Sequence, residues 1–489
     1  MSIDSISEKI QRNFLQDPEF IILSDHKKRY RWKDLQSLVE FYDSIILKEK
    51  RKCLAFFTDR SIATVAIIIA CIRNNITFVP ISKNQPEERI RDIVFQISET
   101  EVLELSENNF VKILESGGQT ATNFENILYV LFTSGSTGSP KGVKITENNL
   151  LNTLAWSDDI FAWRRNDVIG IVTPFYFDIS IFDLILSLTK QIRFHIFSQI
   201  NNHLEFFHEL NSSEVTSIFS TPALFSNISK LDQPSYIKSS RLRRIISGGD
   251  FFPSPDILYW KSKFPELEIY NVWGPTETSI VNTAHLIDRE DMDRLKNGKP
   301  ISIGKSTPKM EVIICDSSND EISLISTDCL VGELMVQGES VGMGYLNQDE
   351  LTSKNFFTFL GKRTYRTGDF GFKEKGEIFM TNRDAHLIKY QGFRIDPREV
   401  ETHLSGLKGI KNSCLILADR INENSELVLI VEADSNFESN VFYIKKFLRN
   451  KVPAYMVPKK IVYVDQIPFN QNGKLDRKKC QSIYVTEYF

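Results

Sequence analysis

Short apolar runs alternate with longer amphipathic stretches along most of the chain. The apolar runs have the length of buried strands, and typical ones lie at 54–58, 168–174, 215–221 and 242–249. Strands that alternate with helical patterns indicate an α/β fold, so the pattern predicts a largely parallel, buried sheet. The longest apolar run, Ile62–Ile72, is too short to span a membrane and predicts a buried helix.

The pattern changes from about Glu311. Closely spaced strand-like segments with Gly-rich turns follow at 331–346 and 365–380, which is typical of β-hairpins. After residues 381–386, the tail of the chain has its own apolar segments at 413–418 and 427–433. We therefore predict a large N-terminal domain built from α/β subdomains and a β-rich subdomain, followed by a small α+β domain.

Charge and cysteine content exclude several classes of protein. The 59 basic and 63 acidic side chains give a net charge of −4 with no long basic run, which argues against nucleic-acid binding by a charged face. The six cysteines include no Cys-x-x-Cys pair, so neither a zinc site nor a disulfide framework is indicated. The N-terminus lacks the basic-then-apolar layout of a secretion signal. We expect a cytoplasmic protein with no membrane partner.

A loop rich in Gly, Ser and Thr, "LFTSGSTGSPKGVKIT" at 131–146, follows a strand-like run at 127–133. The chain returns through a second strand-like run, Gly142–Ile145, before a helix that Thr146 could cap. Glycines in the loop permit positive φ, so successive backbone N–H groups can converge on an anion. The donors and the cation of this candidate phosphate loop are Thr133, Ser134, Gly135, Ser136, Thr137, Gly138 and Lys141. The spacing is not that of a Walker motif, and the loop feeds a strand rather than a helix, so a P-loop ATPase is disfavoured.

The segment Thr133–Val143 resembles the phosphate loop of the adenylate-forming superfamily, which includes acyl-CoA synthetases, firefly luciferases and nonribosomal peptide synthetase adenylation domains. Seven further segments follow in the order of that family, so the resemblance covers essentially the whole chain. They are "FDIS" (177–180), "NVWGPTE" (271–277), "GELMVQGESVGMGYL" (332–346), "YRTGDF" (365–370), "NRDAHLIKYQGFRI" (382–395), "VPAYMVP" (452–458) and "NQNGKLDR" (470–477). Two departures are Asn382, where most relatives have Gly, and the missing Gly in "NNITFVP" (74–80).

The resemblance implies ATP and Mg²⁺ as cofactors and assigns a role to each matching residue. The phosphate loop would bind the β- and γ-phosphates, Thr276 would donate to the α-phosphate, and Glu277 would hold Mg²⁺. Trp273 would stack on adenine, where most peptide synthetase relatives have Tyr, and we expect the larger ring to serve equally. The base would also contact Asn271 and the backbone near Gly249, Asp250 and Val272. Asp369 would accept both ribose hydroxyls, with Arg383 nearby.

The C-terminal segments carry three more expected roles. Lys474 matches the family's catalytic lysine, which bridges the substrate carboxylate and the phosphate. Asp384 matches the hinge about which the small domain rotates between the two half-reactions, so the resemblance implies a division into residues 1–383 and a mobile domain over residues 384–489. Gly392 matches the glycine that lets a pantetheine arm pass close to the backbone.

The segment "FDIS" bears on which acid is activated. Asp178 resembles the aspartate that pairs with the α-ammonium of an amino acid, whereas a fatty acid would leave a buried carboxylate unpaired. The remaining pocket positions carry no charge: they are Ile179, Phe182, Phe219, Ile246, Gly248, Val272, Ile280 and Val281. They favour isoleucine, valine or leucine, while proline and D-alanine stay open. Gly248 stands where D-alanine-activating ligases have a bulkier Cys, and the extra room disfavours alanine.

The sequence therefore predicts an amino-acid-adenylating ligase of the kind used in nonribosomal peptide synthesis and secondary metabolism. No carrier motif follows Lys474, so we expect a free-standing enzyme whose acceptor is a separate phosphopantetheinylated carrier protein or coenzyme A. The lack of a basic cluster for the 3′-phosphate of coenzyme A favours the carrier protein. An acyl-CoA ligase is an alternative, disfavoured by Asp178 and by Phe177, near which acyl-CoA ligases usually carry His. A catalytically inactive ATP-binding module is the other alternative. The joint presence of Thr276, Glu277, Asp369, Arg383 and Lys474 argues against it.

Overall fold

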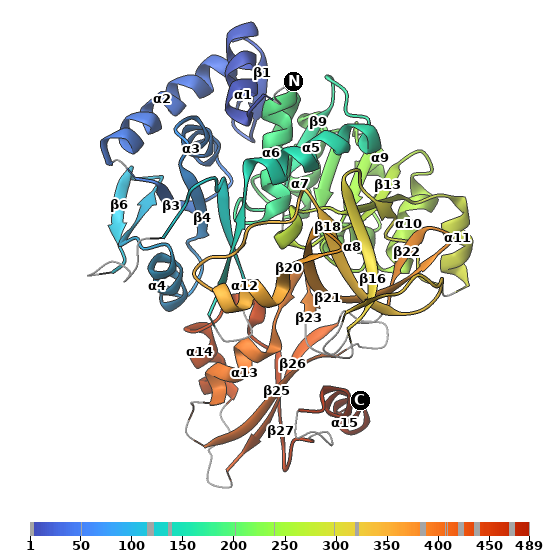
Figure 1. Cartoon of the computed structure of the whole chain (residues 1–489). Helices are drawn as coiled ribbons and strands as arrows, with labels where there is room; N and C mark the ends of the chain where they lie inside the picture. The colour runs from blue at the N-terminus through green and yellow to red at the C-terminus, as the bar shows by residue number, and fades with distance from the viewer. Residues whose placement is uncertain are drawn as a thin grey trace.

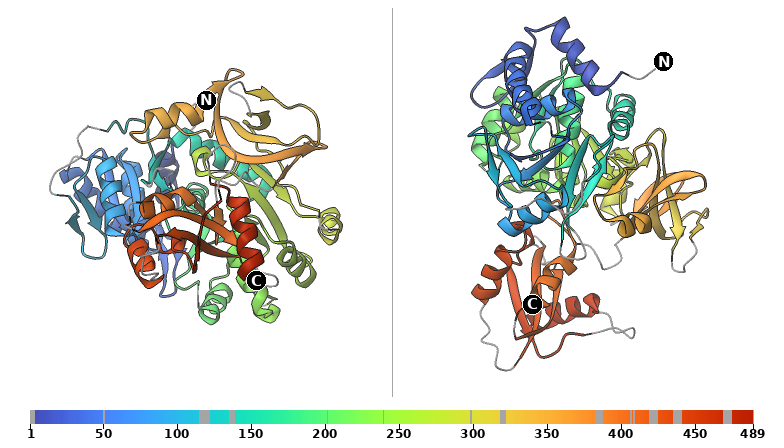
Figure 2. Two further views of the ribbon diagram at one scale, coloured as in Figure 1. Left: turned by 90° about the horizontal axis from the view of Figure 1, so that it is seen from below. Right: turned by 60° about the vertical axis from the view of Figure 1, so that its left-hand side comes forward.

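The computed structural model describes residues 4–49, 51–114, 122–134, 139–200, 202–238, 240–297, 299–317, 322–381, 388–405, 407, 409–418, 425–434, 441–468 and 475–488. It confirms a mixed α/β architecture with a large N-terminal domain and a smaller C-terminal domain (Figures 1 and 2). The right-hand view of Figure 2 shows the small domain below the large one. The predicted junction at 383/384 lies outside the described residues, so this boundary stays a prediction.

The first sheet has nine strands in the order β15-β14-β13-β12-β11-β9-β10-β1-β2. The neighbours from β13 to β1 pair in parallel, and the strands at both edges are antiparallel. The bounds are β1 (Ile21–Ser24), β2 (Arg29–Arg31), β9 (Val168–Ile171), β10 (Arg193–Ile196), β11 (Ser217–Ser220), β12 (Arg244–Ser247), β13 (Glu268–Trp273), β14 (Thr283–Leu286) and β15 (Lys305–Ser306). The central strands are buried along their length, as their unbroken apolar runs predict.

The second sheet has seven strands in the order β19-β8-β7-β4-β3-β5-β6. Its strands β3, β4, β5 and β7 run parallel. The bounds are β3 (Cys53–Thr58), β4 (Thr77–Ser82), β5 (Glu101–Glu104), β6 (Asn109–Lys112), β7 (Tyr129–Thr133), β8 (Lys141–Ile145) and β19 (Gly344–Tyr345). The apolar run at 62–72 forms the buried helix α3 (Ile62–Arg73), as predicted.

The third sheet confirms the β-rich texture predicted after residue 311. Its six strands pair antiparallel throughout. The bounds are β16 (Met310–Asp316), β17 (Ser323–Leu324), β18 (Gly332–Gly338), β20 (Phe356–Phe359), β21 (Lys362–Glu374) and β22 (Glu377–Met380). The short strand β19 leaves this segment and pairs with β8, so the β-rich part is joined to the second sheet.

The small domain contains the hairpin β23–β24 and a three-stranded sheet. The bounds are β23 (Ile388–Tyr390), β24 (Phe393–Ile395), α13 (Pro397–Ser405), β25 (Ile410–Ala418), β26 (Glu426–Ala433), α14 (Val441–Arg449), η2 (Ala454–Met456), β27 (Lys460–Val464) and α15 (Arg477–Tyr488). The apolar segments predicted at 413–418 and 427–433 lie in β25 and β26, which form the domain's own core with α13 and α14.

The other helices of the large domain cover its sheets (Figure 1). Their bounds are α1 (Ile6–Gln16), α2 (Trp32–Glu49), α4 (Glu87–Gln96), α5 (Glu147–Phe161), α6 (Asp178–Lys190), α7 (His203–Ser212), α8 (Pro222–Leu231), α9 (Pro234–Lys238), α10 (Ser254–Lys263), η1 (Thr276–Thr278), α11 (Arg289–Lys296) and α12 (Asp349–Asn355). Within the described part of the chain, no helix combines the length and the apolar character needed to cross a bilayer.

Candidate active site

A cavity of about 1340 Å³ lies where the carboxyl ends of both parallel sheets meet the small domain. The ends of β3, β4, β7 and β11 open into it, and so does the hairpin β23–β24. Ligands of open α/β sheets bind at the carboxyl ends of the strands, so the position of the cavity fits a substrate site.

The cavity brings together residues that the sequence analysis selected from widely separated segments. Eleven of them line it, and they are Thr133, Ser134, Asp178, Ile179, Gly249, Asp250, Trp273, Thr276, Glu277, Asp369 and Gly392. Both the predicted nucleotide residues and the predicted amino-acid carboxylate therefore face one space.

The candidate phosphate loop is closed by a hairpin. Thr133 at the end of β7 pairs with Lys141 at the start of β8, and Thr146 caps α5 through a capping box with Asn149, as predicted. The ammonium of Lys141 lies 5.6 Å from the centroid of the Tyr345 ring. Gly135, Ser136, Thr137 and Gly138 lie outside the described residues.

Glu277 is almost fully buried beside this hairpin, with 2% of its surface exposed. The Tyr345 hydroxyl donates to Glu277 Oε1 at 2.9 Å and lies 3.2 Å from the Tyr365 hydroxyl. Ser279 and Ile280 then adopt positive φ, and this backbone, strained for a β-branched residue, folds the chain back after η1. A buried carboxylate on the cavity wall fits Mg²⁺, which needs only one or two protein carboxylates beside substrate phosphates.

Asp178 begins α6 and lies next to the nucleotide residues. Its Oδ2 accepts a hydrogen bond from the Thr276 hydroxyl at 2.7 Å, and its Oδ1 accepts from the Ile179 N–H at 2.9 Å. Burial raises the pKa of Asp178, the Thr276 hydrogen bond lowers it, and the charge of Glu277 raises it further. A cation placed at Asp178 would relieve both effects, because it would pair with the buried charge.

Trp273 and Asp369 form a buried pair on the cavity wall. The indole Nε1–H donates to Asp369 Oδ2 at 3.0 Å. Asn271, expected to contact the base, donates its side-chain amide to the Ser302 carbonyl at 2.8 Å. The Trp273 side chain therefore does more than present a ring face, because its N–H also holds the Asp369 carboxylate.

The predicted apolar pocket is mostly packed core. Apart from Ile179, none of its residues is among the described residues that line the cavity; they are Phe182, Phe219, Ile246, Gly248, Val272, Ile280 and Val281. The rings of Phe182 and Phe219 pack edge to face at 5.9 Å. A Cβ added to Gly248 would lie 2.7 Å from Val272 Cγ2 and 3.3 Å from Phe219 Cε2. The space that the glycine seemed to leave is thus filled by its neighbours, and the inference that Gly248 enlarges the pocket is wrong.

Three predicted residues, Arg383, Asp384 and Lys474, lie outside the described residues. The described residues that border the segment of Lys474 are Pro468 and Leu475, and neither is among those that line the cavity. The described part of the small domain contributes its β23–β24 hairpin, Leu417, Ser425 and Tyr455 to the cavity wall.

Sequence reasoning missed part of the cavity wall, including Arg60 and Tyr176. Arg60 donates to the carbonyls of Val172 and Ser198 at 3.1 and 3.3 Å, so it links segments that follow different strands. A single arginine after a strand has no motif around it, and no signal in the sequence marks this contact.

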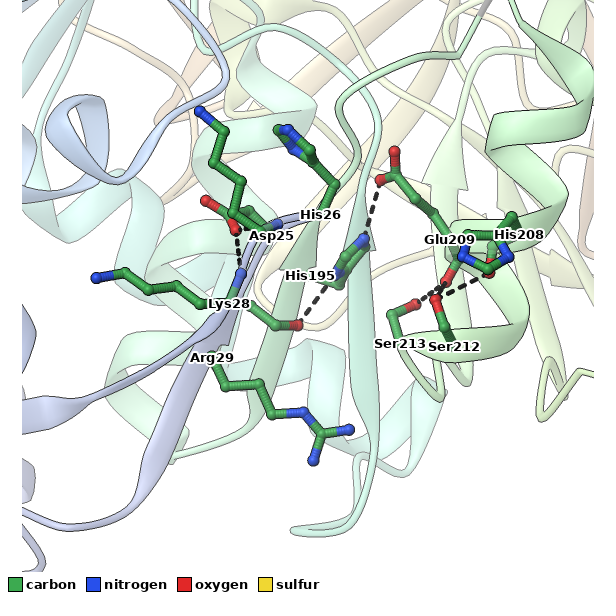
Figure 3. Close-up of a pocket in the computed structure, with 11 residues that line it drawn as sticks. Asp25, His26, Lys28, Arg29, His195, His208, Glu209, Ser212 and Ser213 are labelled. Atoms are coloured by element: carbon green, nitrogen blue, oxygen red, sulfur yellow. Dashed lines mark hydrogen bonds and ion pairs between the residues drawn. The ribbon is translucent and has the colours of Figure 1, made fainter.

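A second hollow of about 220 Å³ is lined by residues 24–29 around β1 and β2, by His195 of β10 and by α7, and it contains a chain of polar contacts (Figure 3). Ser24 Oγ lies 2.9 Å from His195 Nδ1, and His195 Nε2 lies 3.1 Å from Glu209 Oε2. The same Glu209 oxygen accepts the Ser198 N–H at 3.0 Å. Because the Ser198 carbonyl holds Arg60, we interpret this network as support for the cavity wall.

Comparison with known proteins gives matches along the whole chain. The family model described as AMP-binding enzyme matches residues 95–346. The D-alanine–D-alanyl carrier protein ligase of Bacillus licheniformis is 30% identical over 92% of this chain and 93% of its own length. The ligase of the same name from Listeria monocytogenes is 27% identical over 98% of this chain and 99% of its own.

Solved structures share the fold. The Vibrio cholerae adenylation domain AlmE, in complex with glycyl-adenosine-5'-phosphate, gives a TM-score of 0.84 at 19% identity over 100% of this chain and 99% of its own. An NRPS protein containing adenylation and PCP domains gives 0.82 at 20% identity over 97% and 84%.

Proposed function

Because this chain belongs to the family of AMP-binding enzymes, we propose that it activates D-alanine with ATP and transfers it to a separate carrier protein. The chain is a ligase. In the first step, a carboxylate oxygen of the amino acid bonds to the α-phosphorus, the bond to the β-phosphate oxygen breaks, and pyrophosphate leaves. In the second, the sulfur of a phosphopantetheine arm bonds to the carbonyl carbon, the thiol proton passes to solvent, and AMP leaves.

The observation that carries the amino-acid assignment is the contact between Asp178 and Thr276 inside the cavity. An α-ammonium bound to Asp178 would place the adjacent carboxylate beside Thr276, the residue proposed to donate to the α-phosphate. Charge repulsion between carboxylate and phosphate is the main obstacle to this step, so positioned donors lower its barrier. A fatty acid supplies no cation for Asp178, which disfavours the acyl-CoA ligase alternative.

The packing of the predicted pocket positions supports a small side chain. The predicted preference for isoleucine, valine or leucine has no support in the comparisons, whose curated relatives are D-alanine ligases. It rested on counting apolar positions, and these side chains pack against one another. With Val272 and Phe219 occupying the space beside Gly248, the objection to alanine no longer holds. From the resemblance to peptide synthetase adenylation domains we therefore keep the two reaction steps, adenylation and transfer to a carrier protein, but not a role in peptide synthesis.

The remaining roles are proposed from the resemblance, and three of the residues concerned, Trp273, Glu277 and Asp369, line the cavity. Glu277 would hold Mg²⁺, which neutralises phosphate charge when bound. Asp369 would bind the ribose while Trp273 lies against the adenine. Lys474 would bridge the reacting carboxylate and phosphate during adenylation.

Exchange of labelled pyrophosphate into ATP tests this function. The panel should contain D-alanine, L-alanine, glycine, valine, leucine, isoleucine and a medium-chain fatty acid. We expect exchange with D-alanine at least tenfold above that with valine, since one methylene changes discrimination in an apolar pocket by about 10- to 200-fold. Exchange with the fatty acid alone would refute the Asp178 argument, and exchange with none would favour an inactive module.

A further inference from the structure

A buried ion pair joins the two domains. Arg89 in α4 of the large domain donates through Nη1 to Glu399 Oε1 in α13 of the small domain, across 310 positions of sequence. Arg89 is 4% exposed and Glu399 is fully buried. In Figure 1, α13 and α14 of the small domain lie beneath α4. A charge pair removed from water in this way is a specific contact, because each partner would be costly to bury alone.

Aromatic side chains continue the same interface toward the cavity. Phe393 stacks on Tyr455 at 3.7 Å within the small domain, and Phe177 of the large domain meets Phe393 at 5.4 Å. Burial raises the pKa of Tyr455 to about 12, and the charges of Arg89 and Glu399 both act on its hydroxyl. The ion pair and the aromatic stack therefore belong to one interface between the domains, and Phe177, Phe393 and Tyr455 line the cavity.

This contact places the β23–β24 hairpin in the cavity. Gly392 has a φ of +83°, and a Cβ there would lie 2.5 Å from Thr221 Cγ2, so the hairpin backbone is pressed against the large domain. The described neighbours of the Lys474 segment, Pro468 and Leu475, are not among the residues that line the cavity. In this arrangement Gly392, the residue proposed for pantetheine passage, lines the cavity. The described residues that flank Lys474, the residue proposed for adenylation, do not line it.

From this geometry we infer that the Arg89–Glu399 ion pair is a positioning device for the second half-reaction. It stabilises the domain arrangement that forms the thioester, and it must break when Lys474 serves adenylation. The inference rests on the proposed function and goes beyond it by naming the two residues that bias the choice between half-reactions.

Removing one partner of the Arg89–Glu399 pair and exchanging both partners should have different effects. Glu399→Gln leaves the Arg89 guanidinium buried without its counter-charge, which destabilises this arrangement relative to any in which Arg89 reaches water. Reversing both charges restores a pair at the same place. A coupling of this kind is measured by a double-mutant cycle.

The experiment separates the two half-reactions in the full-length protein. Adenylation is followed by pyrophosphate exchange with D-alanine, and transfer by single-turnover reaction of preformed D-alanyl-AMP with pantetheine as the thiol. For Arg89→Met and Glu399→Gln we expect transfer to fall at least tenfold while exchange stays within twofold of wild type. Arg89→Glu combined with Glu399→Arg should recover most of the transfer rate. Glu87→Gln and Arg91→Met, an exposed pair on the same helix, are matched controls expected to change neither rate.

Equal loss of exchange and transfer in the single variants would overturn the inference, because it would mark a general structural role. Unchanged transfer, or additive effects without recovery in the charge reversal, would overturn it as well. A wild-type protein that exchanges pyrophosphate with no amino acid would instead refute the proposed function. Exchange at the wild-type rate also shows that a variant has folded.

Discussion

The indole of Trp273 donates a hydrogen bond to Asp369, so the proposed adenine platform is joined to the proposed ribose acceptor. The bond fixes one carboxylate oxygen of Asp369 before ATP arrives. Such preorganisation lowers the cost of ordering a site at binding.

Trp273→Phe keeps an aromatic face and removes the N–H donor. A hydrogen bond to a charged group contributes about 1.5–3 kcal/mol, so we expect the KM for ATP to rise roughly tenfold or more with a smaller change in kcat. Pyrophosphate exchange measured against ATP and against 2',3'-dideoxy-ATP checks this, because the penalty should shrink when the ribose hydroxyls are absent. Trp163→Phe is the matched control, since the Trp163 indole N–H has no hydrogen-bond partner among the described residues. An equal penalty for both nucleotides would contradict the role of Asp369.

Asp178→Asn should abolish pairing with the α-ammonium. We expect kcat/KM for the amino acid to fall at least a hundredfold, while the KM for ATP changes less than threefold. Because burial raises the pKa of Asp178, wild-type kcat/KM for the amino acid should also decline as the pH is lowered through that pKa. A profile of kcat/KM from pH 5 to pH 8 tests the sign, and a rise in activity toward acid pH would exclude an ionised Asp178 as the ammonium partner.

Asp183 follows Asp178 by five residues in α6, and its buried carboxyl has no hydrogen-bond partner for either oxygen among the described residues. Desolvation raises its pKa well above the ordinary value, so the folded protein retains this proton where the unfolded chain releases it. The free energy of unfolding then falls as the pH rises above the pKa of Asp183 in the unfolded chain, by about 1.4 kcal/mol per pH unit. Asp183→Asn should remove this slope in urea unfolding between pH 5 and pH 7. If the free energy of unfolding of this variant kept the same dependence on pH, a group other than Asp183 would cause it.

Gly248 and Val272 should behave as a coupled pair. Gly248→Cys alone should lower exchange with D-alanine at least tenfold, because its Cβ would press on Val272. Val272 does not line the cavity, so Val272→Ala alone should leave a void behind the cavity wall. The wall could then yield to a larger side chain, and exchange with valine should increase relative to D-alanine. The double variant should recover D-alanine exchange, and additive losses in the cycle would disprove the shared volume.

Lys474→Ala is expected to abolish adenylate formation and to spare thioester formation from added D-alanyl-AMP. The lysine lies outside the described residues, so this prediction rests on the resemblance. Exchange and single-turnover transfer measured side by side decide it, and equal loss of both steps would exclude the assigned role.

Local features of this protein could be predicted from sequence and long-range ones could not. The β7–β8 hairpin and the Thr146 cap depend on residues close together in the sequence, so a short segment is enough to predict them. The Trp273–Asp369 bond spans 96 positions and depends on how two sheets approach. Gly248 was misread for the same reason, because the volume beside a glycine belongs to whichever side chains fold against it.

The strand β19 extends the β-rich segment into the second sheet. Its Tyr345 bonds to Glu277, and Gly304 bridges to Ile378 at another point of the large domain. The three sheets are therefore linked by a strand pairing, a backbone bridge and a buried side-chain hydrogen bond, and a cut between them would break these links. The large domain should unfold as one cooperative unit, so fragments cut between its sheets would not refold independently, whereas the small domain keeps a core of its own.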